Sequence, residues 1–62
     1  MFKPKEHEKP FSHVLEGYQV FVDKRDYMFN VYDVKTGEVM LNTMNSNKAN
    51  DMLYMCAEYN PK

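Results

Sequence analysis

Apolar and polar residues alternate along three stretches in the middle of the chain, and this alternation predicts strands. Residues 18–23 read YQVFVD, where the aromatic and β-branched residues at 18, 20 and 22 share one side. The same two-residue period returns in residues 27–34 and 38–42. We therefore expect three antiparallel strands joined by two hairpins, the first turning through the charged run 23–26 and the second through residues 35–37.

The second hairpin carries the clearest turn signal. Lys35, Thr36 and Gly37 separate the two apolar runs, which predicts a three-residue loop in which Gly37 takes a positive φ. This loop places Val34 opposite Glu38. The cross-strand pairs that follow are Val31 with Leu41, Asp33 with Val39, Tyr32 with Met40, and Asn30 with Asn42. The more apolar face of this hairpin consists of Phe29, Val31, Val39 and Leu41.

The period changes to that of a helix after residue 44. Asn45 or Ser46 can cap a helix whose apolar stripe consists of Ala49, Met52, Leu53, Cys56 and Ala57, and Pro61 ends it. We expect an α+β fold: a three-stranded antiparallel β-meander followed by one C-terminal α-helix packed on one sheet face. In this arrangement Leu53 faces Val31 in the core.

The N-terminal residues show neither period. Residues 1–10 contain three lysines, two glutamates and two prolines, and we interpret them as a charged, mobile or loosely docked arm. Residues 11–62 are then a single small α+β domain. The segment 11–17 is compatible with one helical turn closed by Gly17 or with the lead-in to a strand.

Composition narrows the functional classes. Eight Lys and Arg against nine Asp and Glu give a net charge of -1, so the basic surface typical of nucleic-acid binding is absent. The single cysteine, Cys56, excludes an internal disulfide and a structural zinc site. The chain shows neither a membrane-spanning apolar run nor the apolar stretch of a signal peptide, and we expect a cytoplasmic protein.

Residues that could carry chemistry do not form a recognisable site. The two histidines, His7 and His13, match no metal-ligand spacing, and we interpret both as solvated. Cys56 lies on the apolar helix stripe and is expected to be a small core residue. The carboxylates near the predicted turns, Asp23, Asp26, Asp33 and Glu38, suit local hydrogen bonding and solubility. We expect no enzyme activity, no metal and no cofactor.

The chain is rich in tyrosine and methionine, which suggests an interaction surface. One short helix covers one sheet face, so the second face, with Phe21, Met28, Tyr32 and Met40, lacks a covering element. We predict that this face binds another protein or a second copy of the chain, helped by the helix flank residues Tyr54, Met55 and Tyr59. The alternative is that Phe2 and Phe11 fold back over this face and leave a monomer.

These features favour a small non-enzymatic protein that binds a larger protein as an adaptor or an inhibitor. In size and lack of catalytic motifs the chain resembles, in general character, tiny accessory proteins of bacteriophages and mobile elements that act on a host factor. The alternative is a small nucleic-acid-associated regulatory module, in which the basic residues Lys3, Lys5, Lys9, Lys24 and Arg25 gather on one side. A homodimer is compatible with either hypothesis.

Overall fold

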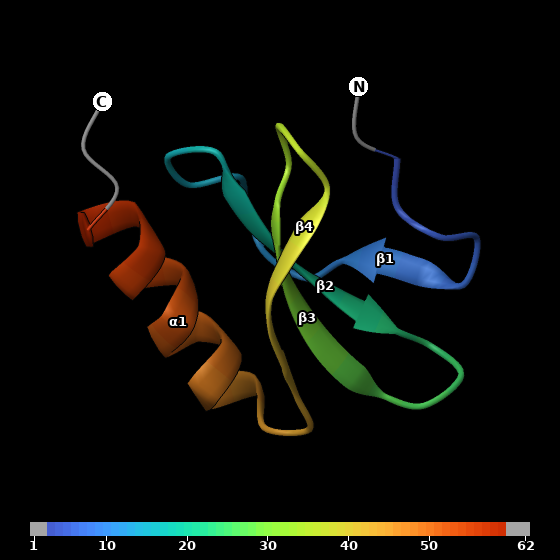
Figure 1. Cartoon of the computed structure of the whole chain (residues 1–62). Coiled ribbons are helices and arrows are strands. Elements are labelled where there is room, and N and C mark those ends of the chain that lie inside the picture. The colour runs from blue at the N-terminus through green and yellow to red at the C-terminus, as the bar shows by residue number, and fades with distance from the viewer. Residues whose placement is uncertain (1–2, 60–62) are drawn as a thin grey trace.

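Four antiparallel strands form one sheet, and the strands lie in chain order. The computed structural model describes residues 3–59 (Figure 1). The elements are β1 (Glu8–Pro10), β2 (Tyr18–Asp23), β3 (Met28–Asp33), β4 (Glu38–Thr43) and α1 (Ser46–Tyr59). The predicted α+β class with a C-terminal helix is confirmed, whereas the predicted count of three strands is wrong because β1 adds a fourth.

The extra strand β1 comes from the segment expected to be a charged arm. It pairs with the outer edge of β2, where Lys9 lies opposite Val22. Backbone bonds continue the pairing on both sides: Lys24 N–H donates to the His7 carbonyl (2.8 Å) and Phe11 N–H donates to the Val20 carbonyl (2.8 Å). β1 has no apolar period, so its position depends on these backbone bonds and on the side chain of Glu8, described below.

The segment between β1 and β2 is an extended lead-in that ends in a tight turn. Leu15 and Tyr18 exchange two backbone hydrogen bonds, of 2.7 and 2.9 Å. The two residues between them, Glu16 and Gly17, have positive φ values of 52° and 87°. Positive φ at both central positions is the signature of a type I′ turn, whose twist suits a hairpin. The helical-turn alternative for residues 11–17 is therefore wrong.

The two later hairpins turn through loops of the same design. Each begins with an aspartate, Asp23 or Asp33, whose carboxylate accepts the backbone N–H two residues further on (2.8 and 2.9 Å). The last residue of each loop has a positive φ, 56° at Tyr27 and 82° at Gly37, and donates its N–H to the carbonyl of that aspartate. The positive φ predicted for Gly37 is confirmed.

The second loop is one residue longer than predicted, which changes the register near the turn. Asp33, not Val34, closes the hairpin opposite Glu38, and Tyr32 lies opposite Val39. A β-bulge restores the predicted register further along, so that the pairs Val31–Leu41 and Asn30–Asn42 are confirmed. The pairs Tyr32–Met40 and Asp33–Val39 are wrong. Met40, the extra residue of the bulge, packs against the core beneath the helix.

Helix α1 covers one face of the sheet (Figure 1). Asn45 caps it: the side-chain carbonyl accepts the N–H groups of Asn47 (2.9 Å) and Lys48 (3.3 Å). The buried cluster between helix and sheet consists of Tyr18, Val20, Val31, Ala49 and Leu53. Leu53 and Val31 thus share one core, as the two-layer arrangement predicts.

Candidate protein-binding surface

The second sheet face, which the sequence suggested as an interface, is largely buried. Phe21 and Tyr32 expose only 3% and 6% of their surface, and their rings meet edge to face with centroids 5.5 Å apart. Met28 is half-buried, and Met40 lies on the helix side because of the bulge. The four side chains proposed for this face therefore do not form one accessible patch.

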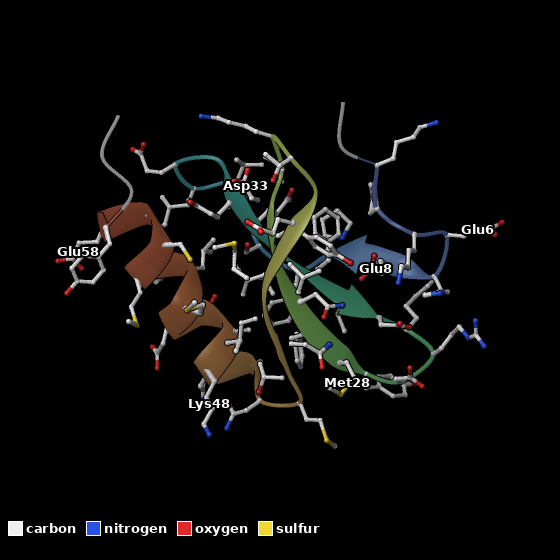
Figure 2. The ribbon with its side chains drawn as sticks, viewed as in Figure 1. Glu6, Glu8, Met28, Asp33, Lys48 and Glu58 are labelled. Carbon is white, nitrogen blue, oxygen red and sulfur yellow. The ribbon has the colours of Figure 1, made fainter. Side chains whose placement is uncertain are left out.

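A buried carboxylate on β1 supplies much of what fills this face. Glu8 lies on β1 (Figure 2) and accepts hydrogen bonds from the Tyr32 hydroxyl (2.8 and 3.0 Å) and the Asn30 amide (2.9 Å). The Lys5 backbone N–H also donates to Glu8 (3.1 Å), and the Asn42 amide donates to the Asn30 side-chain oxygen. Burial, and then the hydrogen bond to Glu8, raise the pKa of Tyr32 to about 12. The network satisfies polar groups that a closed sheet face would otherwise leave unpaired.

Sequence reasoning missed Glu8 because it stands in a Lys- and Glu-rich segment typical of a solvated arm. A usable signal was present on the strands: Asn30 and Asn42 form a cross-strand pair on the same face as Tyr32. Buried amides require partners. A pair of asparagines on a sheet face therefore indicates that another polar side chain, here Glu8, lies within hydrogen-bonding distance of one of them.

Phe11 does not cover the second face. Its ring packs edge-on against Phe29, with centroids 4.7 Å apart, and Phe29 contacts the core under the helix. This part of the monomer alternative is wrong. Phe2, the other residue invoked, lies outside the described residues.

The helix flank is accessible, in contrast to the sheet. Tyr54, Met55 and Tyr59 expose 63%, 51% and 74% of their surface. They lie on α1, whose opposite side carries the buried residues Ala49 and Leu53. Of the seven side chains predicted as an interface, these three are the ones that the structure leaves exposed, and a rigid helix presents them.

A groove beside Tyr54 extends this surface. It lies between the lead-in segment 11–15 and α1 and has a volume of about 340 Å³. Its apolar lining comprises Phe11, Val14, Leu15, Leu53 and Tyr54, and its polar lining comprises Ser12, His13 and Asn50. Phe11 and Val14 are themselves exposed at its edge. We call this cavity the loop–helix groove.

Three exposed charged side chains lie on the described part of α1: Lys48 in the first turn and two carboxylates further along. Asp51 and Glu58 are exposed on α1, and Glu58 lies in its last turn (Figure 2). No basic residue lies in that turn. The negative end of the helix dipole is therefore not offset within the helix itself.

The residues that could carry chemistry are dispersed. Burial, and then the charge of Asp33, raise the pKa of the Cys56 thiol, which favours the protonated and unreactive form. His7 Nδ1 lies 3.2 Å from an Asp23 carboxylate oxygen, and His13 is exposed in the lead-in segment. Within residues 3–59, no three His, Cys, Asp or Glu side chains converge as metal ligands.

Comparisons of the chain with protein-family models, with curated proteins and with solved structures find no match. The described part of the chain has no helix of the length and apolarity needed to cross a membrane.

Proposed function

We propose that this chain is a non-enzymatic, cytoplasmic protein that binds a larger protein, as an adaptor or an inhibitor, through the outer side of α1 and the adjoining loop–helix groove. The observation that carries the proposal is the exposure of Tyr54, Met55 and Tyr59 on a helix whose other side is fixed in the core. Exposed large apolar side chains next to a groove are typical of interaction sites.

The types of side chain agree with this role. Tyrosine provides a large contact area at a low entropic cost and keeps a hydroxyl for hydrogen bonding, so it is enriched at interfaces. Methionine adapts its flexible side chain to partner surfaces. Because α1 is anchored by Ala49 and Leu53, these groups are presented on a preformed surface, and less ordering entropy is lost on binding.

Site-specific photo-crosslinking in cells that express the protein tests the proposal. A benzophenone side chain in place of Tyr54 or Tyr59 should give a covalent adduct with a defined protein. The matched control is the same substitution at Tyr27, which is equally exposed but lies in the β2–β3 loop. If positions 54 and 59 give no adduct, or the same adducts as position 27, the helix flank is not the binding surface.

The structure also offers an observation in favour of the nucleic-acid alternative. The bond from Lys24 N–H to the His7 carbonyl joins the lysine-bearing N-terminal segment to the β2–β3 loop, so that Lys24 and Arg25 lie beside it. Electrophoretic shift assays over a salt series test this candidate. Salt-sensitive binding that is lost in Lys24→Gln/Arg25→Gln and kept in Lys48→Gln would favour it over the helix flank.

A further inference from the structure

Four exposed side chains on α1 form a compact group with a defined order. At about 100° per residue, Asp51 and Glu58 lie between Tyr54 and Met55 around the helix axis. Each carboxylate is three or four residues from both Tyr54 and Met55, the spacing at which helix side chains are neighbours. The helix thus presents an aromatic ring and a thioether with a carboxylate above and below them. We call these residues the 51–58 group.

In the described part of the chain, the carboxylates of the 51–58 group are not paired with a cation, although Lys48 lies one turn before Asp51 on the same helix. Within residues 3–59, neither Asp51 nor Glu58 forms an ion pair. Glu58 lies at the helix end where the dipole is also negative and where a cation would be stabilising. Apolar area next to two uncompensated negative charges is complementary to a basic, partly apolar partner.

We propose that the partner contributes a segment in which an arginine or lysine adjoins a large apolar side chain, an inference that rests on the proposed protein-binding function. The cation stacks on Tyr54 and pairs with Asp51 or Glu58, because an arginine guanidinium combines both interactions. Tyr54 also lines the loop–helix groove. The neighbouring apolar side chain of the partner then enters that groove, beside Val14 and Leu15.

Other occupants fit this surface less well. Nucleic acid is disfavoured because its phosphates would meet two carboxylates. A second copy of the chain that used its own α1 would bring one cation, Lys48, together with Asp51 and Glu58, so carboxylates would outnumber cations at the contact. Its Lys24 and Arg25 lie in the β2–β3 loop, across the sheet from α1 (Figure 1). A contact between these two different surfaces is head-to-tail and produces open chains of molecules unless the rotation closes.

Selection of random 12-residue peptides displayed on phage against the immobilised chain tests this inference. Peptides enriched on the wild-type protein should combine Arg or Lys with aromatic or aliphatic residues. In Asp51→Asn/Glu58→Gln we expect the same peptides to bind roughly 3- to 10-fold more weakly at low salt, with the difference shrinking in 0.5 M NaCl. The control Asp26→Asn/Glu38→Gln removes two exposed carboxylates elsewhere and should leave affinity unchanged.

Each other outcome would overturn a defined part of the inference. Peptides that need Tyr54, as judged with Tyr54→Ser, but carry no excess of basic residues would refute the partner chemistry and leave the protein-binding function standing. If no enriched peptide depends on Tyr54, both proposals are wrong. Sedimentation velocity adds a third outcome: a wild-type dimer that becomes a monomer in Tyr54→Ser would identify a second copy as the occupant and refute the basic segment.

Discussion

Replacement of Glu8 by alanine should destabilise the protein far more than its place in a charged segment suggests. The substitution removes the carboxylate that accepts hydrogen bonds from two buried groups, the Tyr32 hydroxyl and the Asn30 amide. Loss of the acceptor of a buried hydrogen bond costs about 1–3 kcal/mol, so for two donors we expect a loss of about 2–6 kcal/mol in the free energy of unfolding. For a domain of this length, whose total stability is roughly 3–9 kcal/mol, this is a large share.

Urea denaturation followed by circular dichroism measures the effect. With an m value of about 1 kcal/mol/M, the midpoint for Glu8→Ala should fall by about 2 M or more. The control is Glu6→Ala, an exposed glutamate two residues away, which should change stability by less than about 0.5 kcal/mol. Tyr32→Phe removes one donor and keeps the acceptor, so its smaller loss remains measurable if Glu8→Ala does not fold. Equal midpoints for the two glutamate variants would refute the role assigned to Glu8.

Three further predictions concern the core, one loop and alkaline pH. Leu53→Ala should lower the free energy of unfolding by about 2–5 kcal/mol, because it leaves a cavity in the buried cluster. Lys48→Ala, at an exposed position of the same helix, should have the stability of the wild type. Tyr27→Gly should raise the free energy of unfolding by up to about 1 kcal/mol, because glycine adopts the positive φ of 56° without strain, whereas Tyr27→Ala should give no such increase. Equal urea midpoints for the two variants would show that the loop is unstrained. The contribution of Tyr32 to the free energy of unfolding should be constant below pH 10 and fall from pH 10 to about 12, because in this range its hydroxyl ionises in the unfolded chain but not in the folded one. Tyr32→Phe should therefore show a shallower loss of stability over this range, and an unchanged slope would contradict the raised pKa of Tyr32.

The parts of the fold that follow a strong local pattern could be predicted from sequence. Alternation over residues 18–23 and 27–34 located β2 and β3, and the apolar stripe with Asn45 as its cap located α1. Gly37 located the second turn but not its length. Counting back from Gly37 to Asp33, whose side chain also caps the loop, gives the four-residue loop that the structure shows.

What the sequence did not predict depends on contacts between distant residues. β1 is three residues long and polar, so nothing local distinguishes it from an arm; its position is set by pairing with β2 and by Glu8 reaching Asn30 and Tyr32. The same contacts close the face that was predicted to be an interface. The exposed side of α1 was predictable, because in a two-layer fold the helix residues that point away from Leu53 and the sheet face solvent.

The chain order of the strands has a consequence for the way the protein folds. Each strand pairs with the strand next to it in sequence, and no connection passes over the sheet. Each strand pairing therefore needs only one loop to close, which costs less entropy than joining segments that are far apart in the sequence. The hairpins can form by short loop closures, each pre-set by its aspartate and its positive-φ residue. The strands of the sheet can therefore pair one hairpin after another before α1, the last element in the chain, covers their apolar face.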